Sequence, residues 1–188
     1  MYTVLLDSTQ KEDLAQAAQL LRMGEPIAFP TDTVYGLGAN AQDEAAVQKI
    51  YHAKGRPSDK PLILLIHDKA QLSQFANHIS DTAQTLMNAF WPGPLTLIFP
   101  LLEGTVSAAV TRGKTTIGVR MPNHAVALAL LELANVPIAA PSANLSGNPS
   151  PTTAAQVAAD LEGRIAAIVT GSICNIGEAS TIDRKSVV

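Results

Sequence analysis

The strongest constraint on the fold of this chain is the alternation of short apolar segments with helical patterns. Residues 10–22 carry Leu14, Ala17, Ala18 and Leu21 at the spacing of one helix face. Helical patterns also cover 43–53 and 124–134. Two more helical stretches lie before Phe90, and another starts near Thr153. The apolar segments have the length of buried strands and lie at 26–30, 61–66, 95–100, 116–122, 137–141 and 166–170. This alternation predicts an α/β fold with a mixed, buried β-sheet flanked by helices.

Capping signals indicate where several of these helices begin and end. Thr9 and Glu12 fit a capping box for the first helix, and Thr152 or Thr153 fits the N-cap of the last one. Gly55 follows the helix at 43–53 and is expected to end it in the left-handed conformation.

The composition limits the class of protein. The 188 residues are 47% hydrophobic and 15% charged, which suits one globular domain over residues 1–188. A net charge of -3 argues against a surface that binds nucleic acid throughout, so any anion site has to be a local cluster. Cys174 is the single cysteine, which fits a reducing compartment. With neither a signal-like N-terminus nor an apolar segment of bilayer length, the chain is expected in the cytoplasm and without a membrane partner.

Polar residues interrupt the pattern in three loops, at 30–40, 54–61 and 141–152, and two of these loops directly follow an expected strand. In open α/β sheets, ligands collect at the carboxyl ends of strands, because loops from several strands converge there. We therefore expect the ligand site at these loops.

The loop at 54–61 gathers Lys54, Arg56 and Lys60 in an acidic chain. One interpretation is structural, because cations in the last turn of a helix offset its dipole. The other is a phosphate clamp, because prolines stiffen this loop and its cations can form charge-assisted hydrogen bonds. The residues alone leave both interpretations open.

Further polar candidates lie in or just after two other apolar segments. Arg120 lies in the segment at 116–122, where an arginine is costly unless it is paired or lies at the rim of a cleft. Its planar fork suits a ligand carboxylate, and a structural ion pair with Asp or Glu is the alternative. Ser142, Asn144 and Ser150 offer polar groups to a ribose, a phosphate or a polar amino acid, and ordinary turns would also explain them.

Familiar nucleotide and catalytic motifs fit poorly. Gly36, Gly38 and Ala41 match a dinucleotide-binding pattern but lie too far past the expected strand, and a turn with a positive φ is the better interpretation. Residues 112–116 resemble the end of a phosphate loop, but Ala108 stands where its first glycine belongs, which favours a solvated turn. Chemistry in this chain is therefore expected to depend on positioning and electrostatics.

The segments at 30–41, 54–62, 91–100, 116–124, 137–152 and 180–182 together resemble, in order and spacing, the YrdC/TsaC family of threonylcarbamoyl-AMP synthases. The resemblance covers about residues 8–183. It implies an α/β sandwich around a twisted mixed sheet with a large cavity. It also implies a nucleotidyltransferase that makes threonylcarbamoyl-AMP and pyrophosphate from L-threonine, bicarbonate and ATP, with Mg²⁺ held through the ATP phosphates. The product serves the N6-threonylcarbamoyladenosine modification at position 37 of tRNA.

The same resemblance assigns residues to two subsites. The implied threonine site comprises Thr33, Arg120, Ala140 and Ser180. The implied ATP site comprises Lys54, Arg56, Lys60, Thr116, Ser142, Asn144 and Ser150. Many relatives carry a histidine at the position of Leu65, and His67 lies two residues further on, on the same strand face. The chain ends at Val188, before a segment that reaches ATP in many relatives, so the resemblance is either to the short, single-domain form or to a chain that stops early.

Two other hypotheses stay open at this point. A non-catalytic module would bind tRNA or double-stranded RNA in a cavity, although aromatic residues, which stack on bases, make up only 4% of the chain. A related carbamoyl-adenylating enzyme, as in hydrogenase maturation, is the third possibility, and the lack of the extra domains of such proteins counts against it. As partners, the synthase hypothesis implies tRNA-modification proteins that use threonylcarbamoyl-AMP, together with weak tRNA binding.

Overall fold

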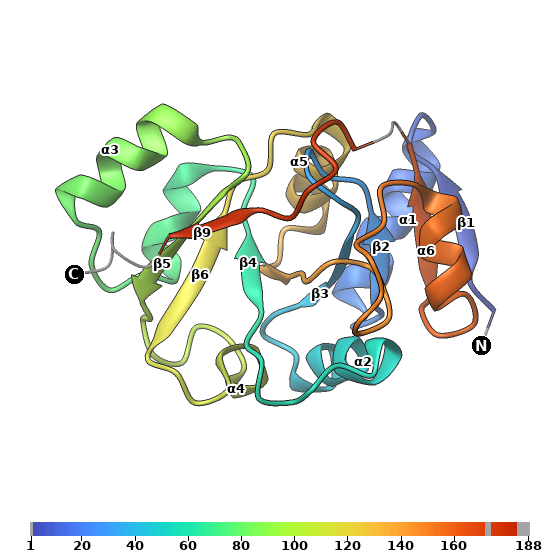
Figure 1. Cartoon of the computed structure of the whole chain (residues 1–188), viewed down its shortest axis with the longest axis horizontal. Coiled ribbons are helices and arrows are strands. Elements are labelled where there is room, and N and C mark those ends of the chain that lie inside the picture. The colour runs from blue at the N-terminus through green and yellow to red at the C-terminus, as the bar shows by residue number, and fades with distance from the viewer. Residues whose placement is uncertain (1, 172–173, 184–188) are drawn as a thin grey trace.

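The computed structural model describes residues 2–171 and 174–183, and their strands form one mixed sheet (Figure 1). The strands are β1 (Val4–Asp7), β2 (Ile27–Phe29), β3 (Gly36–Asn40), β4 (Ile63–Leu65), β5 (Leu95–Pro100), β6 (Thr116–Arg120), β7 (Ile138–Ala139), β8 (Ala167–Thr170) and β9 (Thr181–Asp183). They lie in the order β1-β8-β2-β3-β7-β4-β6-β5-β9. β8 pairs in parallel with β1 and β2, and β4 pairs in parallel with β6, whereas β3 and β7 are antiparallel to their neighbours. The mixed sheet expected from the sequence is confirmed.

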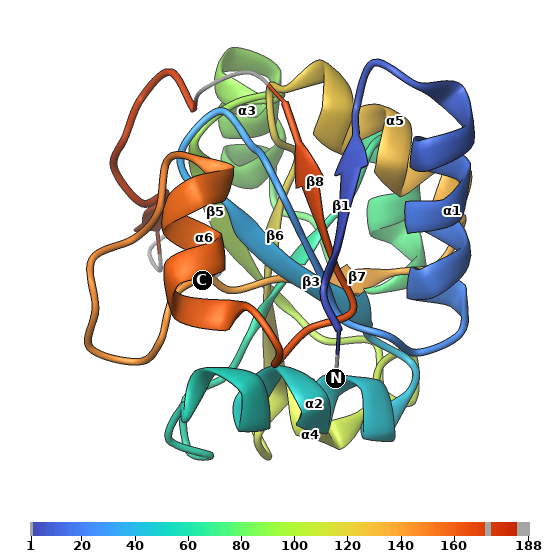
Figure 2. The same cartoon turned by 90° about the vertical axis from the view of Figure 1, so that its right-hand side faces the viewer.

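Helices cover both faces of this sheet. They are α1 (Lys11–Arg22), α2 (Glu44–Lys54), the 3-10 helix η1 (Lys69–Gln74), α3 (Asp81–Phe90), α4 (Ala108–Thr111), α5 (Ala125–Ala134) and α6 (Ala154–Leu161). α1 and α5 lie together on one side of β1 and β8, and α6 lies on the other side (Figure 2). Within residues 2–171 and 174–183, no helix combines the length and the apolar character needed to cross a membrane.

The alternation of side chains along the strands divides the interior into two apolar cores. In β2, Ala28 belongs to the core that contains Val47 of α2, whereas Ile27 and Phe29 belong to the core that contains Leu131 of α5. Burying a side chain as large as Phe29 contributes about 1.5–3 kcal/mol. Because both faces are covered, polar side chains gather where the strands end.

β3 runs through a segment that the sequence assigned to a turn. Gly36 and Gly38 lie in this strand, and neither has a positive φ, so the prediction of a positive-φ turn was wrong. A Cβ atom on Gly38 would lie 2.7 Å from Cε1 of Phe29 and 2.8 Å from Cγ2 of Ile138. The side chains of Phe29 in β2 and Ile138 in β7 therefore leave room only for glycine at position 38.

The helix ends test the capping predictions. α2 ends at Gly55, which has a φ of 57°, and Thr153 forms a capping box at the start of α6, so both predictions are confirmed. The prediction of a capping box at Thr9 was wrong. α1 begins after Gln10, which makes no side-chain cap, and the Thr9 hydroxyl donates to Oδ1 of Asp7.

Candidate functional site

A cavity of about 290 Å³ lies where the polar loops meet. Its walls are formed by residues 33–36, 61–63, 140–142 and 179–180, with Thr31, Arg56, Leu65, Arg120 and Ile182. All three polar loops singled out in the sequence contribute to these walls. The volume is at the lower end of the range for small-molecule sites, and the walls combine an apolar strand surface with two arginines.

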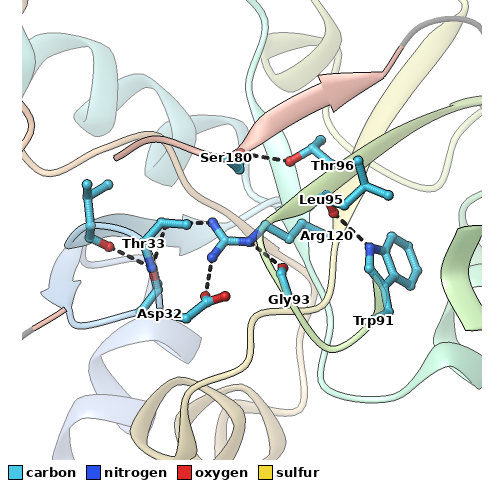
Figure 3. Close-up of polar contacts among 10 residues, drawn as sticks. Asp32, Thr33, Trp91, Gly93, Leu95, Thr96, Arg120 and Ser180 are labelled. Carbon is cyan, nitrogen blue, oxygen red and sulfur yellow. Dashed lines mark hydrogen bonds and ion pairs between the residues drawn. The ribbon is translucent and has the colours of Figure 1, made fainter. Parts of the chain in front are cut away.

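Arg120 lies at the end of β6 and lines the cavity. It contacts Asp32 and Thr33 (Figure 3). We call this part of the site, formed by the buried residues Thr31, Asp32, Thr33 and Arg120, the closed end. The Arg120 side chain is 4% exposed and forms an ion pair with Oδ1 of Asp32. Nη1 donates to Oγ1 of Thr33 at 2.9 Å, and Nε donates to the Gly93 carbonyl at 3.1 Å. Burial lowers the pKa of Arg120, and the Asp32 carboxylate opposes that effect. The sequence left a ligand carboxylate and a structural ion pair as alternatives for Arg120. In the structure Arg120 forms the ion pair with Asp32 and also lines the cavity.

Ser180 lies above this end, on the segment that leads into β9. Its hydroxyl forms a hydrogen bond of 2.9 Å with Oγ1 of the buried Thr96 in β5. The next residue, Thr181, donates its N–H to the Pro94 carbonyl at 3.0 Å and begins the pairing of β9 with β5. These contacts fix Ser180 at the cavity wall (Figure 3).

Arg56 also lines the cavity, just past the left-handed cap of α2, and its side chain is partly exposed. Its Nη2 donates to the Pro61 carbonyl at 3.2 Å. Its Nε is buried and has no hydrogen-bond partner among residues 2–171 and 174–183. Arg56 therefore keeps donors available beside the cavity, and it has no carboxylate bound to it in this part of the chain.

Lys54, the last residue of α2, is 2% exposed and does not line the cavity. Its Nζ donates to the carbonyl of Ser142 and, at 2.6 Å, to the carbonyl of Asn144. Burial lowers the pKa of Lys54 to about 8, Arg56 adds to this effect, and Asp160 opposes it. In this arrangement Lys54 ties the loop after β7 to the end of α2.

The loop after β7 is also held from its other side. The Asn144 amide donates to the carbonyls of Leu145 and Asn148, each at 2.8 Å. Asp160 of α6 accepts from the Leu145 N–H and from the Asn148 amide, each at 2.9 Å. Ser142 lines the cavity and forms a β-bridge with Gly36. The loop is therefore a fixed wall, and Asn144 lies inside it as a buried structural amide.

The structure brings together only part of the set implied by the resemblance. Thr33, Arg120, Ala140 and Ser180 all line the cavity, as do Arg56 and Ser142. The cavity walls do not include Lys54, Lys60, Thr116, Asn144 and Ser150. Leu65 lies in the wall, but His67 does not.

Three polar residues near the closed end carry no role in the sequence-based set. Asp32 pairs with Arg120, Thr31 lines the wall beside Thr33, and Thr96 binds Ser180. Thr31 and Asp32 directly follow the strand segment at 26–30, and this position is the signal that could have identified them. Thr96 lies within a strand and gives no such signal.

These features define an α/β protein with a cavity, lined by Arg56 and Arg120, that suits a small anionic ligand. The family model Sua5/yciO/yrdC, described as "Telomere recombination", matches residues 19–186. The chain therefore belongs to the Sua5/YciO/YrdC family, as the sequence indicated.

Relatives of known name support this placement. The chain is 57% identical over 175 residues to the threonylcarbamoyl-AMP synthase of Bacillus subtilis (strain 168). The aligned region covers 93% of this chain and 51% of that protein. It is 36% identical to the threonylcarbamoyl-AMP synthase of Vibrio vulnificus (strain YJ016), over 86% of this chain and 87% of that protein. The crystal structure of P. abyssi Sua5 complexed with L-threonine matches with a TM-score of 0.92 and 48% identity, over 97% of this chain and 54% of that chain. The chain thus spans about half the length of the Bacillus and Pyrococcus proteins.

Proposed function

We propose that this protein is a threonylcarbamoyl-AMP synthase, which makes threonylcarbamoyl-AMP and pyrophosphate from L-threonine, bicarbonate and ATP. The observation that carries the proposal is the pair of arginines, Arg56 and Arg120, that line one cavity. Arg120 pairs with Leu65 across β6 and β4, and Arg56 donates to the Pro61 carbonyl. Pro61 and Leu65 are four residues apart in the chain, a span of at most about 14 Å. One cavity can therefore hold an amino-acid carboxylate and a phosphate group together.

The relatives support this division of the cavity. A protein 48% identical to this chain is described as complexed with L-threonine, and the Bacillus and Vibrio relatives are named for the same reaction. In the proposed arrangement Arg120 holds the threonine carboxylate beside Thr33 and Ser180. Arg56 and Ser142 face the nucleotide. Lys54 acts on the nucleotide only through the loop that it anchors.

The proposed reaction joins the two substrates through a carbamate. The threonine amine attacks bicarbonate, and water leaves as the carbamate forms. A carbamate oxygen then attacks the α-phosphorus of ATP, and the bond to pyrophosphate breaks. The protein contributes mainly by placing these groups and by offsetting charge with Arg56 and Arg120.

Mg²⁺ is the cofactor that this reaction implies. No group of three His, Cys, Asp or Glu side chains suited to a metal occurs in residues 2–171 and 174–183. Among the residues that the structure describes, the polar side chains of the cavity wall are hydroxyl groups and two arginines, without a carboxylate, which fits a Mg²⁺ ion held by the ATP phosphates and water. When bound in this way, Mg²⁺ would offset charge on the triphosphate.

The proposed product also suggests the partners and the setting of the protein. A mixed anhydride of a carbamate and AMP is a reactive intermediate that has to be consumed by a transferase. We propose that tRNA-modification proteins use it in the cytoplasm to form N6-threonylcarbamoyladenosine at position 37 of tRNA.

Pyrophosphate release tests the proposal directly. Purified protein with ATP, bicarbonate and Mg²⁺ is expected to release pyrophosphate only when L-threonine is added, and threonylcarbamoyl-AMP is expected in the mixture by mass spectrometry. A release that does not depend on threonine, or no release at all, would contradict the proposal. Salt-sensitive tRNA binding without any turnover would instead favour the RNA-binding alternative.

A further inference from the structure

The closed end of the cavity contains a chain of hydrogen bonds with a direction that can be assigned. Oγ1 of Thr31 lies 2.7 Å from the Val34 carbonyl, which can only accept, so the hydroxyl proton of Thr31 points there. Oγ1 of Thr31 then accepts from the N–H of Thr33 at 3.2 Å and from the hydroxyl of Thr33 at 3.1 Å. The hydroxyl proton of Thr33 is therefore committed to Thr31.

This direction decides what Thr33 can offer to a ligand. With its proton committed, Oγ1 of Thr33 acts as an acceptor. One lone pair accepts from Nη1 of Arg120 at 2.9 Å. A hydroxyl oxygen has two lone pairs, so one remains for a hydrogen-bond donor in the cavity that Thr33 lines.

Asp32 fixes the neighbouring guanidinium in a complementary way. A guanidinium has five N–H donors. Among the residues that the structure describes, Asp32, Thr33 and the Gly93 carbonyl each take one donor of Arg120. One donor on Nη1 and one on Nη2 are left for a ligand. Because contacts on three sides hold the plane of the fork, these two donors have a fixed direction.

The backbone of residues 32–33 is itself fixed. The Ile176 N–H donates to the Asp32 carbonyl, and the Gly177 N–H donates to the Thr33 carbonyl, each at 3.0 Å. Asp32 is 5% exposed, and its second carboxylate oxygen is buried. These contacts hold the backbone of Asp32 and Thr33 in place beside Arg120.

We propose that Thr31 and Asp32 are positioning residues that set the hydrogen-bond polarity of this subsite. Asp32 orients two donors of Arg120, and Thr31 turns Thr33 into an acceptor beside them. The matching ligand carries a carboxylate next to an ammonium or hydroxyl donor, as an α-amino acid does. The inference rests on the proposed function, because it explains how the closed end would select L-threonine.

A Thr31→Val variant tests the orientation of Thr33, because it keeps the shape of the side chain and removes the hydroxyl. Calorimetry is expected to show a Kd for L-threonine at least about tenfold higher, with the Kd for ATP changed less than about twofold. Thr3→Val is the matched control. Thr3 is also buried, donates to the Ile165 carbonyl at 2.7 Å and accepts from the Gly163 N–H at 2.9 Å. Both partners lie in the turn between α6 and β8, outside the cavity walls. The control is expected to bind both ligands as the wild type does.

Two analogues identify the donor that Thr33 accepts from. L-2-aminobutanoate lacks the threonine hydroxyl, and 3-hydroxybutanoate lacks the ammonium group. The wild type is expected to bind one of them far more weakly than threonine. In Thr31→Val this preference is expected to shrink, because the freed Thr33 hydroxyl can turn and donate. An unchanged preference would overturn the role of Thr31.

Asp32 is tested by comparing two replacements. An asparagine oxygen can still accept from Nη2 of Arg120, so Asp32→Asn is expected to bind L-threonine within about threefold of the wild type. Asp32→Ala removes the acceptor and is expected to raise the Kd for L-threonine at least about tenfold. Equal effects of both replacements would show that charge, and not positioning, is the contribution of Asp32.

The outcomes separate this inference from the proposed function. If the wild type binds no L-threonine, the proposed function fails. If the wild type binds L-threonine and the Thr31→Val and Asp32→Ala variants bind it equally well, only the inference is overturned.

Discussion

Arg120 and Lys54 are both buried cations beside the cavity, but the protein uses them differently. Arg120 has a carboxylate partner in Asp32 and keeps two donors for a ligand among the residues described. Lys54 has no carboxylate bound to it there and gives two of its three donors to backbone carbonyls. Burial of a cation therefore does not by itself indicate a ligand site. The donors that remain, and their direction, decide whether the cation binds a ligand or holds a loop.

Arg120→Ala is expected to give the largest effect. The Kd for L-threonine should rise about 100-fold or more, while ATP binding changes little. The free energy of unfolding should fall by about 3–5 kcal/mol, because Asp32 is left as an unpaired buried charge. Chemical denaturation and calorimetry measure the two effects.

Two further variants protect this test against simple misfolding. Adding Asp32→Ala to Arg120→Ala should restore part of the lost stability without restoring threonine binding. Arg120→Lys keeps the charge but loses the planar fork, so it should fold well and still bind L-threonine weakly. Threonine binding at wild-type strength in either variant would contradict the role of Arg120.

Lys54→Met is expected to change how stability depends on pH. The pKa of Lys54 is about 8 in the folded protein and near 10.5 when it is exposed. Between these values the unfolded chain binds more protons, so the contribution of Lys54 to the free energy of unfolding increases with pH. The full effect is about 3 kcal/mol. It is measured as the difference between wild type and variant in denaturation experiments from pH 7 to pH 11, and a difference that stays constant with pH would contradict it.

Arg56→Ala should have the opposite selectivity to Arg120→Ala. Its partly exposed side chain has one carbonyl partner, so the free energy of unfolding should change by no more than about 0.5 kcal/mol. The Kd for ATP should rise about tenfold, and that for L-threonine less than about twofold. Equal losses for both ligands, measured by calorimetry, would show that the two arginines do not act separately.

Lys60→Ala should give the smallest effect. Lys60 is exposed and lies outside the cavity walls. A charge in this position acts on a phosphate mainly through solvent, so the Kd for ATP should rise by about threefold or less, and the difference should vanish at high salt. A loss as large as that of Arg56→Ala would place Lys60 in the phosphate site.

The sequence could predict the general architecture and the loops of the site, because periodicity and strand-end position are local properties. It could not distinguish Arg120 from Lys54. The partner of Arg120 is 88 residues away in the chain, and the partners of Lys54 are backbone carbonyls 88 and 90 residues away, which leave no trace in residue type. For the same reason β3 was missed, since Gly38 is required there by the side chains of Phe29 and Ile138 from other strands.

The most direct test of the central claim is a calorimetric titration of L-threonine into Arg120→Ala and Lys54→Met side by side. Arg120 is expected to bind the ligand, and Lys54 only to hold the loop after β7. We therefore expect no measurable binding to Arg120→Ala and a Kd for Lys54→Met within about threefold of the wild type. Tight binding to Arg120→Ala, or loss of binding in a folded Lys54→Met, would contradict this claim.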